Sequence, residues 1–87
     1  MKKARKNKRV LIFDEEGLKK LAEKLKEVRK KQGFTQEELA YQSELTLSQI
    51  ARIETMKINP TVSTMFRIAR TLDVPVSELF DFKLRKL

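Results

Sequence analysis

The chain has 87 residues and a formal net charge of +8, so it has room for one hydrophobic core and its excess of base favours a polyanionic partner. It contains neither cysteine nor histidine, which excludes disulfides, thiolate or imidazole catalysis and the usual zinc sites. Its apolar runs are too short to span a membrane, and residues 10–13 are too short for the core of a signal peptide. We therefore expect a cytoplasmic protein with no metal, no cofactor and no membrane partner.

The positive charge is concentrated at the two ends of the chain. Residues 1–9 contain six lysines and arginines and no acid, residues 83–86 contain three bases, and residues 14–81 contain 11 bases and 12 acids. Nucleic-acid binding by the central part must therefore depend on individual side chains rather than on net charge. We expect a basic arm at residues 1–13, a folded domain at residues 14–80 and a basic tail at residues 81–87. The arm is either simply solvated or follows the backbone or minor groove of DNA.

Both ends of the folded part carry a short run with strand-like sequence. Residues 10–13 are β-prone, and Phe80, Phe82 and Leu84 alternate with charged residues. These runs predict short terminal strands at residues 9–13 and 80–84, which pair within one chain or across a dimer. The alternative is that both runs are irregular caps over a helical core.

The first helix is predicted to begin at Asp14, whose carboxylate can cap it, and to end before Gly33. Its inward positions recur at three- and four-residue spacing, which predicts one buried stripe. The members of this stripe are Leu18, Leu21, Ala22, Leu25, Val28 and Arg29.

Two capping boxes follow, 11 residues apart. Thr35 with Glu38 begins a helix that runs to about Gln42, and Thr46 with Gln49 begins another that runs to about residue 54 or 55. Two short helices joined by so short a connection form the αα unit of a helix-turn-helix.

Two more helices are predicted beyond this unit, one from Thr61 and a short one from Pro75 to about Phe80. Their expected inward residues are Val62, Met65, Phe66, Ala69, Leu72, Val76, Leu79 and Phe80. No strand–helix alternation is present, so the predicted fold class is all-α, with five helices and short terminal strands as a possible addition.

Several segments together match one protein family. They are residues 35–40 (Thr-Gln-Glu-Glu-Leu-Ala), 50–54 (Ile-Ala-Arg-Ile-Glu), 59–61 (Asn-Pro-Thr) and 74–80 (Val-Pro-Val-Ser-Glu-Leu-Phe). With them, residues 18–80 resemble the phage repressor and Cro type of helix-turn-helix domain, often called the XRE family. The resemblance implies a five-helix domain that binds double-stranded DNA, usually as a homodimer on a two-fold symmetric operator.

The resemblance also implies roles for individual residues. Gln36, Lys57 and Asn59 match positions that contact DNA phosphates, and Arg52 matches a position that reads a base or reaches a phosphate. Four residues match the start of the recognition helix, which spans residues 47–54: Thr46, Leu47, Ser48 and Gln49. Arg29 and Glu54 match a buried, structural ion pair between the first and third helices.

Three residues depart from the family pattern. Glu44 and Met56 stand where glycine is usual, and a left-handed residue with a Cβ costs about 1–2 kcal/mol, so these departures leave the geometry of the turn open. Leu47 replaces a residue that is often polar and predicts contact with a thymine methyl group.

The sequence therefore predicts a transcriptional regulator that acts as a repressor and places residues 47–54 in the DNA major groove. The alternative is an antitoxin-like or adaptor protein that binds a protein partner through its termini, with DNA binding secondary. An enzyme is not expected, because the chain has no histidine, cysteine or phosphate-binding loop.

Overall fold

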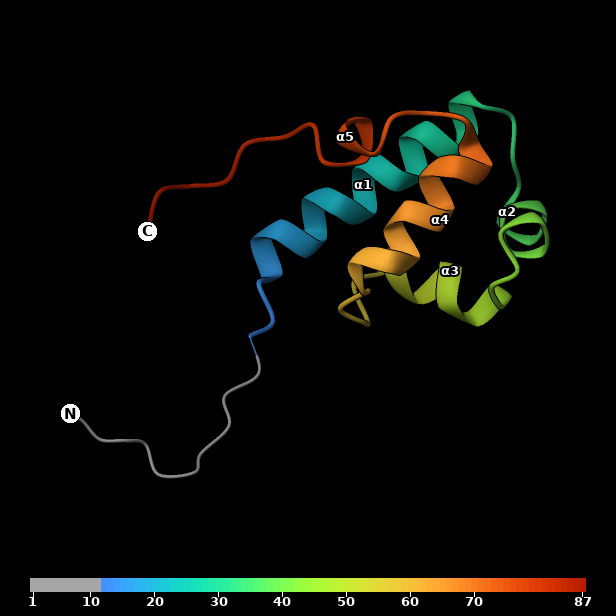
Figure 1. The fold of residues 1–87 in the computed structure, drawn as a ribbon. Helices are drawn as coiled ribbons and strands as arrows, with labels where there is room; N and C mark the ends of the chain where they lie inside the picture. Colours follow the sequence, from blue (N-terminus) through green and yellow to red (C-terminus); the bar gives the residue numbers. More distant parts are fainter. Residues whose placement is uncertain (1–11) are drawn as a thin grey trace.

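Five helices make up the fold in the computed structural model, which describes residues 12–87. They are α1 (Glu15–Lys31), α2 (Gln36–Ser43), α3 (Leu47–Glu54), α4 (Val62–Leu72) and α5 (Val76–Leu79). In Figure 1, α4 lies at the centre, with α1 above it, α3 below it and α2 at its side. The predicted all-α fold is confirmed, and within residues 12–87 no helix is both long and apolar enough to cross a membrane.

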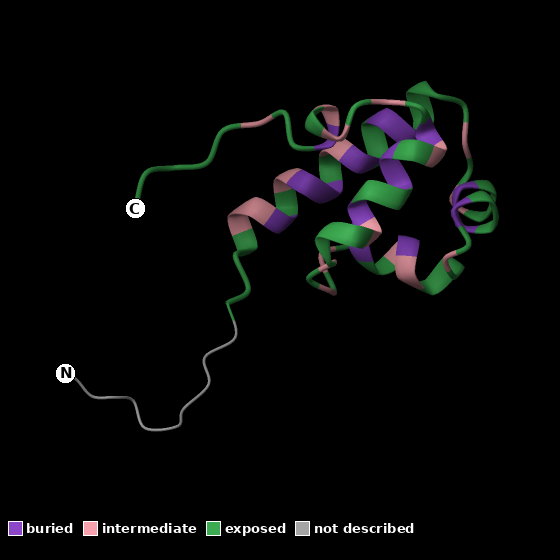
Figure 2. Ribbon diagram, viewed as in Figure 1, coloured by how far each residue is buried: buried purple, intermediate pink, exposed green. Residues whose placement is uncertain are grey.

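The core is built from one face of every helix, where Figure 2 shows the buried residues in purple. Each helix contributes at least one fully buried side chain: Leu25, Leu39, Ile50, Ile68 and Leu79. The predicted stripe of α1 is confirmed, because all six of its members are buried. Burial of apolar side chains stabilises α2, α3, α4 and α5, which at 8, 8, 11 and 4 residues would be too short to persist alone.

The predicted inward face of α4 is partly wrong. Met65, Ala69 and Leu72 are buried as expected, but Val62 is 64% exposed and Phe66 is 43% exposed. Ile68 is buried in their place, because the face that meets the core is centred on residues 65, 68, 69 and 72. Val62 and Phe66 lie at the edges of that face and are only partly covered.

The predicted strand at residues 80–84 is wrong, and residues 12 and 13 are not in a strand either; residues 9–11 lie outside the described part of the chain. The Phe82 N–H donates to the Phe80 carbonyl at 2.9 Å, a bond that closes a tight turn and does not belong to a β-ladder.

Beyond this turn the tail binds α1, as an irregular cap. The Arg85 N–H and Nε both donate to the Glu16 carboxylate at 3.1 Å, and the Lys20 ammonium donates to the Lys83 carbonyl. The hydrogen bond from the Arg85 side chain, followed by that from its N–H, lowers the pKa of Glu16 from its ordinary value.

Local capping sets the helix boundaries around the turn. Both predicted capping boxes are present, with the Thr35 and Thr46 hydroxyls each accepting an N–H bond at 3.0 Å.

Glu44, which caps the C-terminus of α2, is left-handed at φ 60° and ψ 36°, and Met56 has φ 63°. The turn thus has the left-handed conformation at Glu44 although this residue is not glycine. Arg67 Nη1 donates to the Ser43 carbonyl at 3.2 Å and to Glu44 Oε1 at 3.1 Å, which fixes the turn against α4.

Replacing Glu44 with glycine should stabilise the protein by about 0.5–1 kcal/mol. Glycine relieves the steric cost of a Cβ in the left-handed region, while the gain is reduced by glycine's greater freedom in the unfolded chain and by loss of the exposed Arg67 bond. Chemical denaturation of Glu44→Gly measures the change, with Glu44→Gln as the control that loses the charge but keeps the Cβ. A Glu44→Gly protein less stable than the parent would show that the turn is not strained.

Candidate nucleic-acid interface

The outer face of α3 is open to solvent. Ile50 and Ile53 point into the core, while Leu47, Ser48 and Arg52 are exposed on the opposite side. A short helix that presents a hydroxyl, an apolar group and a guanidinium offers the side-chain chemistry that reads base edges in a major groove.

Thr46 and Gln49 lie at the start of α3 and serve as its capping box. The Gln49 N–H donates to the Thr46 hydroxyl at 3.0 Å, and the Gln49 side-chain oxygen accepts from the Thr46 N–H at 2.9 Å. The Thr46 hydroxyl proton and the Gln49 amide N–H groups remain available as donors. Both residues can therefore hold the helix and offer hydrogen-bond donors at its exposed end.

A buried ion pair fixes α3 against α1. Arg29 Nε donates to Glu54 Oε2 at 2.6 Å and Arg29 Nη2 donates to Glu54 Oε1 at 3.0 Å, so the contact is bidentate. Arg29 Nη1 also donates to the Phe34 carbonyl at 2.9 Å, just before α2. The side chains of Arg29 and Glu54 are 9% and 1% exposed, so little solvent screens the pair.

Gln36, the first residue of α2, joins this network. Its Nε2 donates to Glu54 Oε1 at 2.9 Å, a contact that the sequence did not suggest because 18 residues separate the two. A side-chain amide carries two N–H donors, so one remains for an external acceptor. The position is half-buried, at a helix N-terminus, where N–H groups favour an anion.

The loop between α3 and α4 carries Lys57 and Asn59, both exposed. The Lys57 N–H donates to the Arg52 carbonyl at 2.7 Å, which ties the loop to the end of α3. Asn59 Nδ2 donates to the Ile12 carbonyl at 3.1 Å. Sequence reasoning missed this second contact, since no local pattern connects residues 47 positions apart. Asn59 therefore also holds the backbone at Ile12, the first residue that the structure describes.

Comparison with known proteins places this geometry among related domains. The Helix-turn-helix family model matches residues 25–79. An "HTH-type transcriptional regulator PuuR" of Escherichia coli is 37% identical over 57 residues, which cover 66% of this chain and 31% of that protein. The chain thus spans about a third of the length of PuuR. An uncharacterized HTH-type transcriptional regulator of Archaeoglobus fulgidus is 36% identical over 59 residues, which cover 68% of this chain and 84% of that protein.

Solved structures agree with the sequence matches. The restriction-modification controller protein C.AhdI from Aeromonas hydrophila is similar with a TM-score of 0.70 and 33% identity, over 72% of this chain and 96% of that one. The controller protein C.Esp1396I is similar with a TM-score of 0.68 and 34% identity, over 74% of this chain and 84% of that one.

Replacing Arg29 with alanine should lower the free energy of unfolding by about 3–5 kcal/mol, because Glu54 would stay buried without its charged partner. The matched control is Arg67→Ala, which removes an exposed ion pair and one hydrogen bond to the Ser43 carbonyl and should cost about 1–2 kcal/mol. Urea denaturation of both variants measures the contrast. Equal losses for the two variants would contradict a special role for the buried pair.

Proposed function

The chain belongs to the helix-turn-helix family, and on this premise we propose that it is a transcriptional regulator, acting as a repressor, that binds double-stranded DNA through α3. The observation that carries the proposal is the exposed face of α3, with Leu47, Ser48 and Arg52 outward and Glu54 anchored beneath. A helix held this firmly can enter a major groove in one orientation, which sequence-specific reading requires. Such a regulator resides in the cytoplasm, on the nucleoid, and catalyses no reaction.

Contacts with phosphates set the position of the domain on DNA. Gln36 offers its second amide N–H at the start of α2, Lys57 offers an ammonium group from the α3–α4 loop, and Asn59 lies two residues further along the same loop. These groups flank the two ends of the α2–α3 unit, so together they fix its register without reading bases.

Base reading falls to the exposed end and face of α3. Arg52 can donate two parallel hydrogen bonds to guanine, and Ser48 can bond several base edges. Leu47 is 44% exposed and has no polar atom in its side chain, so it suits a thymine methyl group. Thr46 and Gln49 add donors at the N-terminus of α3.

A homodimer on a two-fold symmetric operator follows from the size of the reading surface. One eight-residue helix contacts only a few base pairs, whereas two copies related by a two-fold axis read two half-sites about one helical turn apart. The controller proteins named above are related domains of similar size, and C.AhdI matches this chain over 96% of its own length.

The second candidate is an antitoxin-like or adaptor protein that binds a protein partner through its termini. It is supported by the position of Ile12 and of the tail residues Phe82 and Leu84, which border the same apolar hollow. Stoichiometric co-purification of a different protein with the full chain would favour this candidate, and a homodimer alone would count against it.

Selection of bound sequences from random duplex DNA tests the proposed function. The parent chain should select a palindromic consensus, and Arg52→Ala should relax one position in each half-site, with about 1–3 kcal/mol of discrimination lost there. Lys57→Ala is the control: it should weaken binding to all sequences alike, because it removes a phosphate contact. No consensus with the parent chain would overturn sequence-specific binding, and a uniform loss with Arg52→Ala would remove that residue from base reading.

Deleting residues 1–9 tests whether the basic arm follows DNA. If its six bases meet six phosphates, the slope of log affinity against log salt should become shallower by about 5, because each contact releases counterions. Substituting the three bases of residues 83–86 with glutamine is the matched control for basicity at the other terminus. An unchanged slope after deletion would show that the arm is merely solvated.

A further inference from the structure

The side chain of Gln36 is fixed by a buried carboxylate. Its Nε2 donates to Glu54 Oε1 at 2.9 Å, a contact between the first residue of α2 and the last residue of α3. Gln36 is half-buried, so its side chain reaches from this carboxylate toward the surface. A fully exposed glutamine would instead sample several rotamers.

The contact also decides which way round the Gln36 amide lies. A carboxylate beside an arginine accepts hydrogen bonds and cannot donate one, so the amide nitrogen of Gln36, and not its oxygen, must face Glu54. The second N–H then points away from Glu54 in the plane of the amide. A glutamine without this partner would turn its oxygen outward as readily as its nitrogen, and an oxygen offers a phosphate no hydrogen bond.

The carboxylate of Glu54 is itself immobile. Arg29 Nη2 donates to the same Oε1 at 3.0 Å, and Arg29 Nε donates to Oε2 at 2.6 Å. The Glu54 side chain is 1% exposed, so it cannot turn toward water. The charge of Arg29 also offsets that of Glu54, so an anion near Gln36 meets little net repulsion from the pair.

We propose that Glu54 is a positioning residue for the phosphate contact of Gln36. Held by Arg29, it aims the second amide N–H of Gln36 outward at the start of α2, ready for a DNA phosphate. The inference rests on the proposed function, because that function supplies the phosphate. The buried pair would then have a second role besides anchoring α3, since one carboxylate joins the helix that reads bases to the residue that grips the backbone.

The size of the effect follows from the freedom that Gln36 has already lost. Ordering a glutamine side chain costs conformational entropy, which a flexible residue would lose only when it binds. Holding the amide in advance spares the binding step this cost. The gain corresponds to about tenfold in affinity.

Replacing the ion pair with apolar residues tests the positioning. The double variant Arg29→Met with Glu54→Leu removes the acceptor of Gln36 but keeps both positions filled, and such replacements of buried pairs are often neutral for stability. Affinity for duplex DNA of random sequence is measured with and without Gln36→Met, in the parent and in this background. We expect Gln36→Met to weaken binding about tenfold in the parent but less than about twofold in the apolar background.

The outcomes of this cycle are distinct. Equal losses from Gln36→Met in the two backgrounds would overturn the proposal, because a pair that only anchors α3 would leave the contribution of Gln36 unchanged. The absence of any loss in the parent would overturn it too, because Gln36 would then make no phosphate contact. Gln42→Met is the matched control: this glutamine lies exposed on the same helix, and its replacement should leave binding unchanged in both backgrounds.

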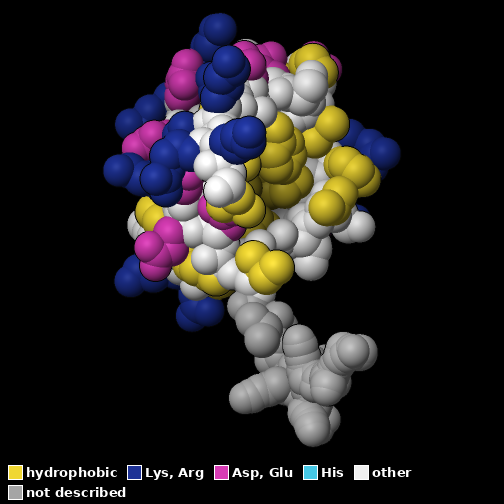
Figure 3. Space-filling view, turned by 90° about the vertical axis from the view of Figure 1, so that its left-hand side faces the viewer, with side chains coloured by type: hydrophobic (Ala, Val, Ile, Leu, Met, Phe, Trp, Pro, Cys, Tyr) yellow, Lys and Arg dark blue, Asp and Glu magenta, His cyan; other side chains and the backbone are white. Residues whose placement is uncertain are grey.

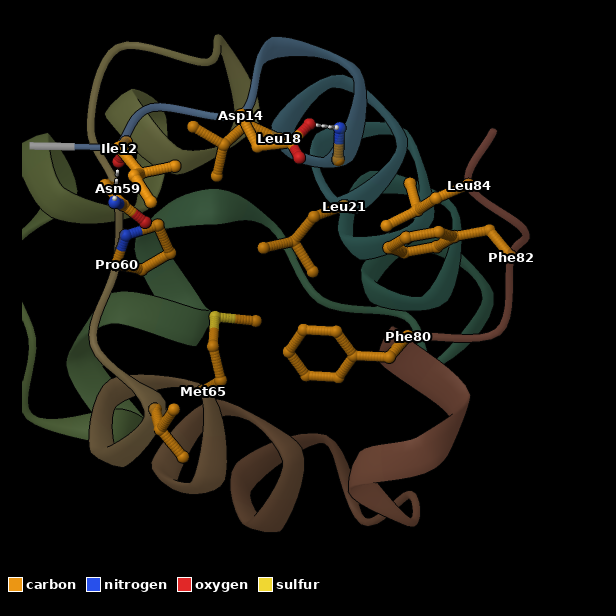
Figure 4. Close-up of a pocket in the computed structure, with 12 residues that line it drawn as sticks. Ile12, Asp14, Leu18, Leu21, Asn59, Pro60, Met65, Phe80, Phe82 and Leu84 are labelled. Atoms are coloured by element: carbon orange, nitrogen blue, oxygen red, sulfur yellow. Dashed lines mark hydrogen bonds between the residues drawn. The ribbon is translucent and has the colours of Figure 1, made fainter. Parts of the chain in front are cut away.

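A second control separates positioning from a general loss of stability. Leu21 is buried and lines an apolar hollow of about 390 Å³ between the start of α1, the start of α4 and residues 80–84. Figure 3 shows hydrophobic side chains gathered around this hollow, and Figure 4 shows Leu21 beside Met65 and Phe80. Leu21→Val should lower stability there, yet Gln36→Met should still weaken binding about tenfold in this background. Loss of the Gln36 effect in the Leu21→Val background would overturn the proposal.

Side-chain relaxation of the parent by NMR provides a test that does not depend on the folding of any variant. The Gln36 amide should be rigid on the picosecond-to-nanosecond timescale in the protein alone, whereas the amide of Gln42 should be mobile. A Gln36 amide as mobile as that of Gln42 would overturn the proposal.

The same measurements separate this inference from the proposed function. If the parent binds duplex DNA but Gln36→Met costs the same in both backgrounds, the DNA-binding function stands and the positioning role is wrong. If the parent binds no duplex DNA, the proposed function itself is wrong, and the positioning role falls with it.

Discussion

The orientation of α3 depends on the buried contact between Arg29 and Glu54. Every nitrogen of the guanidinium and both oxygens of the carboxylate are hydrogen-bonded, with Gln36 and the Phe34 carbonyl completing the set. Two charges taken out of water are tolerated when they are paired and further hydrogen-bonded in this way. An eight-residue helix has little stability of its own, so its direction is set by what it is bound to. Here one ion pair joins α1, the entry to α2, and α3.

Three of the helices are followed by a residue that is left-handed although it is not glycine. Glu44, Met56 and Asp73 follow α2, α3 and α4 with φ between 59° and 63°. Each conformation carries a steric cost, lower for aspartate than for the other two. The helices are nonetheless held by the common core, and Arg67 binds the turn at Glu44 directly. Tertiary packing therefore maintains a turn geometry that the residue types alone would not favour.

Two surfaces of different character meet at the α3–α4 loop. The exposed face of α3 is polar with one apolar side chain, and the hollow beside α1 is almost entirely apolar. Lys57 lies near the first surface, while Asn59 and Pro60 border the second. The ends of this short loop belong to α3 and α4, and both helices are anchored in the same core.

The sequence by itself determined the helices, their caps and most of the core. Capping boxes join residues three apart, and a buried stripe repeats every three or four residues, so both are visible without the fold. The resemblance added the pairing of Arg29 with Glu54. Only the tertiary structure decided that residues 80–84 bind α1 instead of forming a strand, that Gln36 meets Glu54, that Asn59 meets Ile12, and that Val62 remains exposed. These contacts join residues 18 to 69 positions apart or depend on the edge of a packed face. No local period encodes them, because they arise from how the finished helices meet.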